Sequence, residues 1–347
     1  MRVRLKRLAD QVIVITGASS GIGLATARLA GKKGAKLVLA ARSDDALRQL
    51  VQELRRQGVE AVHVDADVGE EEDVRWIAHE AQRAFGGFDT WVNNAGVSVY
   101  GRSLEVTLHD MRRVFDTNFW GVVHGSRVAC ETLRQRGGAL INVGSIVSDI
   151  AAPLQGIYSA SKHAVKGWTD ALRLELEDER APVSVTLIKP GPIDTPYTQH
   201  ARNYLRDQPT HVAPVYAPES VAQAILHAAT RPVRDLYVGG SARMMAAVGT
   251  IAPRATDKVS GPLFMKGTHS GRPRGDKEAL YEASEDLRER GDYQGRVRRS
   301  NYTRMATHPA LTGALFVGAG LLMAAMREER GTGGSGPAAW TERHLEA

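Results

Sequence analysis

The chain is poor in cysteine and carries no recognisable secretion signal. Cys130 is the only cysteine among 347 residues, which excludes an intramolecular disulfide. A single thiol fits a reducing compartment. The basic residues 1–7 are followed by a strand pattern, without the apolar region of a secretory signal. We therefore expect a cytoplasmic protein.

Metal-ligand spacing and nucleic-acid-binding modules are also lacking. His63, His79 and His124 do not have the spacing of metal ligands, so we expect no metal site. The net charge is +6, but aromatic residues make up 6% of the chain and are not interleaved with the basic ones. A nucleic-acid partner is therefore not expected. The positive charge fits a counter-charged surface such as anionic lipid better.

What the chain does contain is a repeated alternation of apolar strand segments and helical patterns. This alternation predicts an α/β fold, a Rossmann-type doubly wound parallel sheet of about seven strands. The predicted strands are Val12–Ile15, Lys36–Ala40, Ala61–Asp65, Thr90–Val92, Ala139–Val143, Val183–Lys189 and Asp235–Val238. The predicted helices include Ile22–Lys33, Met111–Arg136, Gly156–Glu179 and Pro218–Thr230.

A glycine-rich turn follows the first strand. Gly17, Gly21 and Gly23 lie where this strand gives way to the helix predicted over Ile22–Lys33. Glycines let the main chain approach a pyrophosphate closely, and a helix N-terminus favours negative charge. The order of strand, glycine turn and helix therefore predicts a dinucleotide site.

Tyr158 and Lys162 lie four residues apart, and Ser145 stands upstream. Residues at i and i+4 share one face of a helix, so the ammonium can favour the ionised phenol. A free phenol has a pKa of about 10, too high for proton transfer near neutrality, and the lysine is expected to lower it. Ser145 can donate a hydrogen bond to the oxygen that the tyrosine protonates.

The end of the second predicted strand bears on the choice of cofactor. A carboxylate at this position would accept hydrogen bonds from a ribose 2′-OH and repel a 2′-phosphate. The chain has Arg42 there and no acid, and a planar guanidinium suits phosphate. We therefore expect NADP(H) to be preferred over NAD(H). Asp44 and Asp45, after Ser43, are interpreted as acids at the N-terminus of the next helix.

Six motifs in this order resemble those of the short-chain dehydrogenase/reductase family. Besides the glycine turn, Ser145 and the Tyr158–Lys162 pair, they comprise 93–96 (Asn-Asn-Ala-Gly), Asn118 in a helical stretch, and 190–195 (Pro-Gly-Pro-Ile-Asp-Thr). The resemblance covers about residues 8–240 and is closest to the reductase subtype of about 250 residues.

This resemblance implies roles for particular residues. The implied catalytic residues are Asn118, which positions a water in a proton relay, Ser145, Tyr158 and Lys162. Asp67 and Val68 match the pair that contacts adenine. The implied cofactor-binding residues are Thr16, Gly17, Ser19, Ser20, Gly21, Ile22, Gly23, Arg42, Asp67, Val68, Asn94, Ala95, Gly96, Tyr158, Lys162, Pro190, Gly191, Ile193 and Thr195.

The expected activity is the NADP(H)-dependent interconversion of a carbonyl and a secondary alcohol on an apolar small molecule. The family also implies a homodimer or homotetramer, assembled through helices near Met111–Arg136 and Gly156–Glu179. Two other functions remain open. One is an NADP(H)-sensing regulator or scaffold, and the other is an isomerase or dehydratase of the same fold, which would consume no net cofactor.

The C-terminal extension is harder to interpret. We predict a catalytic domain over residues 1–250 and an extension over 251–347. Residues 241–266 look helical, whereas 267–304 read as a linker or weakly docked arm with one helical stretch near 276–290. Residues 310–326 are uncharged. They fit a C-terminal membrane anchor, a docked helix or a loose segment.

Overall fold

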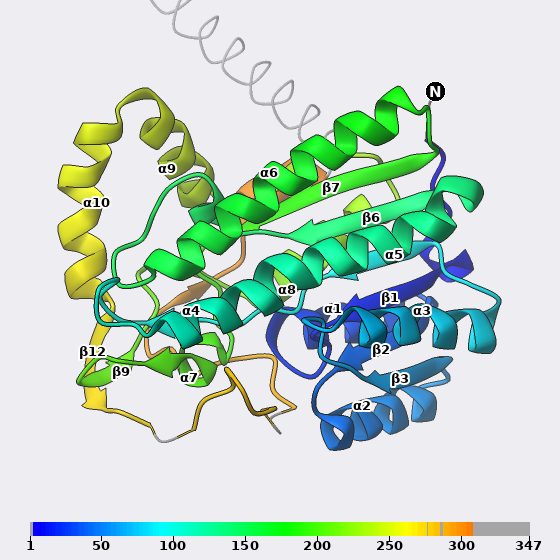
Figure 1. Ribbon diagram of the computed structural model, residues 1–347, viewed down its shortest axis with the longest axis horizontal. Coiled ribbons are helices and arrows are strands. Elements are labelled where there is room, and N and C mark those ends of the chain that lie inside the picture. Colours follow the sequence, from blue (N-terminus) through cyan, green and yellow to red (C-terminus); the bar gives the residue numbers. More distant parts are fainter. Residues whose placement is uncertain (1–2, 276, 285–286, 308–347) are drawn as a thin grey trace, which may run out of the picture. The chain divides into compact units, whose positions relative to one another are not determined.

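Seven parallel strands form the central sheet (Figure 1), which confirms the predicted fold class. The computed structural model describes residues 3–275, 277–284 and 287–307. The sheet order is β3-β2-β1-β4-β6-β7-β11. The order reverses between β1 and β4, which leaves a crevice at the carboxyl edge where such sheets bind ligands. The strands are β1 Val12–Thr16, β2 Lys36–Ala41, β3 Ala61–Asp65, β4 Thr90–Asn93, β6 Gly138–Val143, β7 Val183–Pro190 and β11 Asp235–Val238.

Helices cover both faces of this sheet, so its central strands are mostly apolar. In β1, Ile13 and Ile15 face one core cluster while Val12 and Val14 face the other. The first face is covered by α1 Gly21–Lys32, α2 Asp44–Arg56 and α8 Pro218–Ala228. The second is covered by α3 Glu71–Phe85, α5 Gly121–Arg136 and α6 Gly156–Asp178.

The long helix predicted over 111–136 is interrupted by a wide turn. It comprises α4 Leu108–Phe115, a π-helical turn Asp116–Trp120, and α5. Such turns inside helices are frequent at functional sites. Asn118 lies within this one and is fully buried.

Small elements surround the carboxyl edge of the sheet. The helical prediction for 241–266 is confirmed by α9 Gly240–Ile251 and α10 Pro253–Gly267. The remaining elements are β5 Val99–Tyr100 paired with β8 Arg202–Asn203, β9 Asp207–Pro209 with β12 His269–Pro273, β10 Val215–Tyr216 with β13 Val297–Arg298, α7 Tyr197–His200, α11 Asn301–Thr307, and 3-10 turns at Leu8–Asp10 and Ile146–Ser148.

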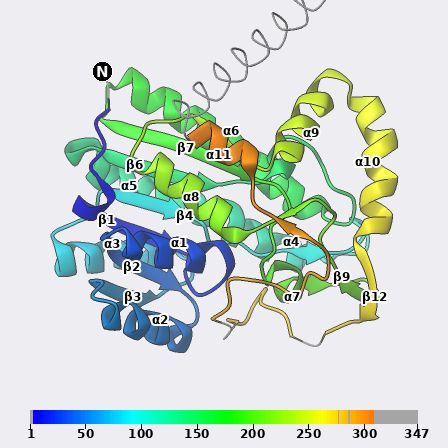
Figure 2. The same cartoon turned by 180° about the vertical axis from the view of Figure 1, so that it is seen from behind.

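Residues 277–284 and 287–298, here called the strap, differ from the prediction. A helix was expected near 276–290, but the described residues 277–284 and 287–290 form none. The expectation of a linker or weakly docked arm was also wrong, because Leu280 is fully buried against Val99, Val106 and Val114. Figure 2 shows the strap, in yellow and orange, crossing the carboxyl edge of the sheet near α7.

The chain divides into two compact units, Met1–Arg304 and Met305–Ala347, and the fold above is that of the first. The apolar segment 310–326 lies outside the described residues. Within the described part of the chain, no helix combines the length and apolar character needed to cross a membrane. The domain boundary at residue 250 stays a prediction.

Candidate active site

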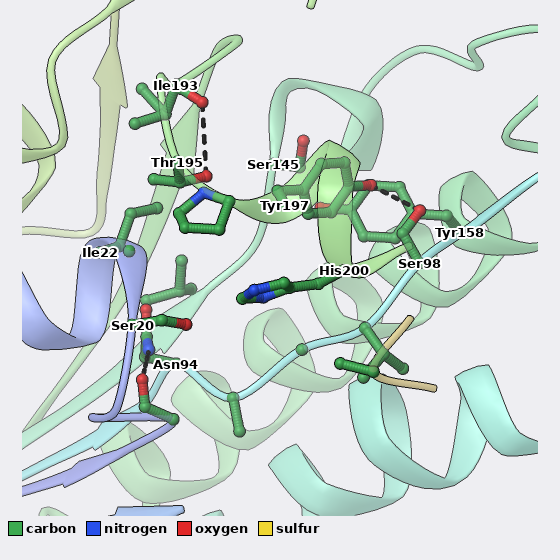
Figure 3. A pocket seen from close by; sticks show the side chains of 18 of the residues that line it. Ser20, Ile22, Asn94, Ser98, Ser145, Tyr158, Ile193, Thr195, Tyr197 and His200 are labelled. Carbon is green, nitrogen blue, oxygen red and sulfur yellow. Dashed lines mark hydrogen bonds between the residues drawn. The ribbon is translucent and has the colours of Figure 1, made fainter. Parts of the chain in front are cut away.

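A cavity of about 290 Å³ opens at the carboxyl edge of the sheet. Its walls come from the loops after β1, β2, β3, β4, β6 and β7, together with α7, α10 and the strap. Figure 3 shows Ser20, Ile22 and Asn94 on one side of this pocket, and Tyr158 with Tyr197 on the other. The pocket therefore joins the glycine turn to the tyrosine motif.

The glycine turn is fixed by a short hydrogen-bond network. Gly17 has a φ of +66°, and a Cβ there would lie 2.8 Å from the Ala95 Cα. The Asn94 Nδ2 donates to the carbonyls of Thr16 and Gly17 at 2.9 and 3.2 Å. The Thr16 hydroxyl accepts from the main-chain N–H of Asn94 and Ala95. Thr16 and Asn94 thus hold the turn against the end of β4, and the first turn of α1 faces the pocket.

Tyr158 is partly buried on the pocket wall, on the first turn of α6. Burial raises the pKa of its phenol above the ordinary value, while hydrogen bonds with the Tyr197 and Ser145 hydroxyls act in the opposite direction. The Tyr158 and Tyr197 rings meet edge-on, with 5.4 Å between their centres. The structure therefore brings Ser145 to Tyr158 as expected. It also adds a second hydroxyl, that of Tyr197.

Lys162 lies one turn further along α6. Its ammonium is 5.8 Å from the centre of the Tyr158 ring and donates to the Val143 carbonyl at 2.9 Å. Burial lowers the pKa of Lys162 to about 8. Burial raises the pKa of Tyr158, and hydroxyl groups rather than this ammonium oppose the rise, so the lowering expected from Lys162 is not found here.

Asn118 does not line the pocket. Its amide accepts from the Val97 N–H at 2.8 Å, and donates to the Val97 carbonyl at 2.9 Å and to the Ser161 hydroxyl at 3.1 Å. In this arrangement Asn118 braces the chain after β4 from behind. The neighbouring Thr117 lines the pocket, and its buried hydroxyl has no hydrogen-bond partner among the described residues.

The loop after β7 closes the opposite wall. Pro190, Gly191, Ile193 and Thr195 all line the pocket. Asp194, in the same loop, is buried; this raises the pKa of its carboxyl, while Arg290 and the N–H groups of Gly291 and Tyr293 in the strap act against the rise. The strap thus lies against this loop, with Gly291 packed on the Thr195 carbonyl.

Arg42 contacts the strap in a way that its position in the sequence did not indicate. Its two terminal nitrogens donate to four main-chain carbonyls, those of Ala279 at 2.6 Å, Leu280 at 3.2 Å, Tyr281 at 2.9 Å and Glu282 at 3.2 Å. Burial lowers the pKa of the guanidinium from its ordinary value, yet arginine stays charged in proteins.

Asp67 lies near Arg42 at the end of β3. Its carboxylate pairs with Arg113 and accepts from the Gly69 N–H at 2.9 Å. Arg113 also donates to the Leu280 carbonyl at 3.1 Å. Two guanidinium groups therefore hold the same strap carbonyl, beside the Asp67–Val68 pair expected to contact adenine.

Most of the predicted site residues meet in this one pocket. Thr16, Gly23 and Asn118 support it from behind. The predicted residues that line it are Gly17, Ser19, Ser20, Gly21, Ile22, Arg42, Asp67, Val68, Asn94, Ala95, Gly96, Ser145, Tyr158, Lys162, Pro190, Gly191, Ile193 and Thr195.

Several lining residues were missed or left open by the sequence. The Tyr197 hydroxyl donates to the Ser98 hydroxyl and accepts from the Gln155 amide, both at 2.8 Å. His200 extends between the glycine turn and Tyr158 (Figure 3), and its Nε2 lies 2.9 Å from the Ser284 hydroxyl. The apolar triplet Ala279-Leu280-Tyr281 within a charged segment was the signal that could have indicated a docked strap.

The arrangement fits a dinucleotide. The N-terminus of α1 offers main-chain N–H groups at a glycine turn, as a pyrophosphate requires. A Cβ at Gly96 would lie 3.8 Å from the Lys162 Nζ, so this glycine leaves room beside the lysine. The cavity continues from there to Tyr158, which is the path a nicotinamide would follow.

A doubly wound parallel sheet with a glycine turn at its switch point defines a Rossmann-type dinucleotide-binding protein. Residues 11–205 match the family model described as short chain dehydrogenase, and the chain belongs to that family. The predicted resemblance is therefore confirmed. Members of this family are oxidoreductases that use a nicotinamide cofactor and act on small molecules.

Individual relatives agree with this assignment. The chain is 51% identical over 323 residues to the uncharacterized oxidoreductase YxnA of Bacillus subtilis (strain 168), covering 91% of each chain. A short-chain dehydrogenase/reductase from Burkholderia phymatum in complex with NAD aligns with a TM-score of 0.63 and 28% identity. It covers 80% of this chain and 98% of its own.

An alcohol dehydrogenase from the archaeon Thermococcus sibiricus, complexed with 5-hydroxy-NADP, is also similar. It aligns with a TM-score of 0.58 and 28% identity, over 66% of this chain and 95% of its own. One neighbour thus holds NAD and the other an NADP derivative, so the comparisons do not decide between the two cofactors.

Proposed function

We propose that this chain is an NADP(H)-dependent oxidoreductase that interconverts a carbonyl and a secondary alcohol on an apolar small molecule. The observation that carries the proposal is that Ser145, Tyr158 and Lys162 share one continuous pocket with the glycine turn. The nicotinamide would supply or accept the hydride, and the protein would supply position and proton transfer.

Tyr158 is the proposed general acid in reduction and general base in oxidation. Because burial raises the pKa of its phenol, the group is protonated at neutral pH and can donate to a carbonyl oxygen. The hydrogen bonds with Ser145 and Tyr197 favour the phenolate and so assist release of the proton. Ser145 is proposed to orient the substrate oxygen beside the phenol.

Lys162 is the proposed partner of the phenol and of the nicotinamide ribose. With a pKa of about 8, most of its ammonium is charged at neutral pH. Gly96 leaves space beside the Nζ, where a ribose hydroxyl could accept a hydrogen bond. Asn118 is proposed to support the loop after β4 and a proton relay behind it.

An apolar substrate is favoured by the walls beyond Tyr158. Ile146, Val147 and Ala152 form a buried cluster with α9, against which Phe264 of α10 packs. Phe264 also lines the pocket together with Val212. Apolar walls with a few well-placed polar groups are typical of sites for small molecules.

NADP(H) is proposed because Arg42 stands at the end of β2, where no carboxylate is present to accept a ribose 2′-OH. A guanidinium recognises phosphate through two parallel N–H donors.

Turnover of a panel of ketones with NADPH, followed by the absorbance of the reduced cofactor, tests the function. Tyr158→Phe removes the acidic proton and is expected to lower kcat by roughly 10²–10⁴-fold. Tyr204→Phe is the matched control, because its hydroxyl bonds Asp110 outside the pocket and activity should persist. Undiminished turnover in Tyr158→Phe, or turnover without change in cofactor absorbance, would contradict the proposal.

A further inference from the structure

The strap covers the adenosine end of the pocket and is anchored on several sides. Ala279, Ala283 and Ser284 line the cavity together with Arg42 and Asp67. The strap therefore forms part of the wall that a bound dinucleotide would meet.

Anchors outside the pocket hold the strap in place. The Tyr281 hydroxyl donates to the Asp110 carboxylate of α4 at 2.7 Å. Glu289 pairs with Arg28 of α1 at 2.8 Å. A Cβ on Gly291 would overlap the Thr195 carbonyl oxygen, so this glycine allows close approach to the loop after β7. These contacts reach three separate elements, which distinguishes the strap from a loose tail.

The decisive contact is the one with Arg42. A guanidinium has five N–H donors, four of them on its terminal nitrogens. In this chain the two terminal nitrogens donate to four strap carbonyls. The Nε–H has no acceptor among the described residues, and no pair of parallel donors is left for a phosphate. The carbonyl oxygens would also repel a 2′-phosphate, whereas a 2′-OH needs no guanidinium.

A second contact concerns both cofactors equally. The Arg288 carbonyl accepts from the Gly21 N–H at 2.8 Å, at the N-terminus of α1. A pyrophosphate would use main-chain donors of this turn, and NAD and NADP share that group. Any difference between the two cofactors must therefore arise at Arg42.

We propose that the strap is a cofactor-specificity determinant: its carbonyls at 279–282 compete with the 2′-phosphate of NADP(H) for Arg42, so that NADP(H) binds only when this part of the strap moves away. The inference rests on the proposed function. The apparent affinity for a ligand is reduced by the fraction of protein in the competent state. Weakening the strap should thus raise affinity for NADP⁺ more than for NAD⁺.

The experiment measures NADP⁺ and NAD⁺ dissociation constants for the full chain and two strap variants. Glu289→Gln removes the charge pair with Arg28 and should tighten NADP⁺ binding about twofold to fivefold. Leu280→Ala removes the buried anchor and should tighten it about tenfold or more. Glu282→Gln is the matched control on the same strap, because its exposed side chain has no hydrogen bond or ion pair within the described ranges.

Hydrogen exchange of residues 279–284 gives a second readout that does not depend on the variants folding. NADP⁺ should accelerate exchange there in the unaltered chain, and NAD⁺ should do so less. Equal gains in affinity for both dinucleotides, no gain, or protection of 279–284 by NADP⁺ would overturn the competition while leaving the proposed function intact. If neither dinucleotide binds any of these proteins, the proposed function itself fails.

Discussion

His211 is half-buried on the pocket wall, where it stacks on Tyr197 and lies edge-on to Tyr293 of the strap. Burial lowers the pKa of its imidazole to about 4, although a hydrogen bond with the Thr195 main chain opposes the shift. Its Nε2 has no partner among the described residues, so a proton there would gain no hydrogen bond. His211 is therefore neutral in the folded protein at physiological pH.

This burial predicts a loss of stability in mild acid. The unfolded chain binds a proton at His211 near pH 6.5, whereas the folded chain binds it only near pH 4. As pH falls through this window, the free energy of unfolding decreases. Once the pH is below about 4, the decrease due to His211 amounts to roughly 3 kcal/mol. The free energy of unfolding, measured by urea titration between pH 7 and pH 4, should fall less steeply in His211→Gln. His79→Gln, which alters an exposed histidine, should keep the original slope; equal slopes in all three proteins would refute the assignment.

The sequence could predict the placement of site residues that depends on helix spacing or on the end of a strand. Tyr158 and Lys162 share a helix face because of their spacing, and Ser145 follows a strand whose end must reach the carboxyl edge. The spacing predicted a lowered pKa for Tyr158, whereas burial by elements remote in the sequence raises it. The amide of Asn118 is likewise engaged by Val97, which no spacing rule indicates.

At the scale of elements, the glycine turn that connects β1 to α1 has no room for an added methyl group at Gly23. A Cβ on Gly23 would overlap the Gly17 carbonyl and lie 2.7 Å from the Asn94 Nδ2. Gly23→Ala should therefore force the glycine turn to shift, lowering the free energy of unfolding by about 1–3 kcal/mol and dinucleotide affinity at least tenfold. Thermal denaturation and dinucleotide titration would measure the two effects.

Gly167 offers the opposite control in α6. A Cβ there meets nothing within 4 Å. Gly167→Ala should stabilise the helix by roughly 0.5–1 kcal/mol and leave dinucleotide affinity unchanged. If Gly23→Ala behaves like Gly167→Ala, the tight contact in the glycine turn is not a constraint.

The seven strands of the sheet were predictable because both faces of a parallel sheet are buried, which makes each strand a short apolar run. The strap was not predictable in this way. It uses its main-chain carbonyls rather than a periodic apolar face, and its partners lie far away in the sequence. Arg42 and Leu280, for example, are 238 residues apart. Its charged side chains resemble those of a helix or linker. Composition alone therefore predicted a helical stretch in a linker, where the structure has a docked segment without a helix.

At the scale of the whole molecule, the strap ties the extension to the sheet. The sequence predicts a catalytic domain ending at residue 250, yet Leu280 is fully buried with Val99, Val106 and Val114. Burial of one leucine contributes about 1.5–3 kcal/mol. A chain ended at residue 250 should therefore unfold at lower urea concentration than one ended at residue 307, which retains all described C-terminal residues. Equal urea midpoints for the two chains would favour a domain boundary at residue 250.

The predicted homodimer or homotetramer would assemble through α5 and α6. Trp120, which immediately precedes α5, and Leu174 of α6 are 48% and 64% exposed. Such exposed apolar side chains fit the predicted homodimer or homotetramer.

The distance along the chain between Arg42 and the strap also sets an order of events during synthesis. The ribosome releases the N-terminal part first, so all seven strands, through Val238, emerge before residue 279. Contacts between segments so far apart are also slow to form, because a long loop must close. A nascent chain consequently carries the Arg42 guanidinium before the carbonyls that later engage it have been made.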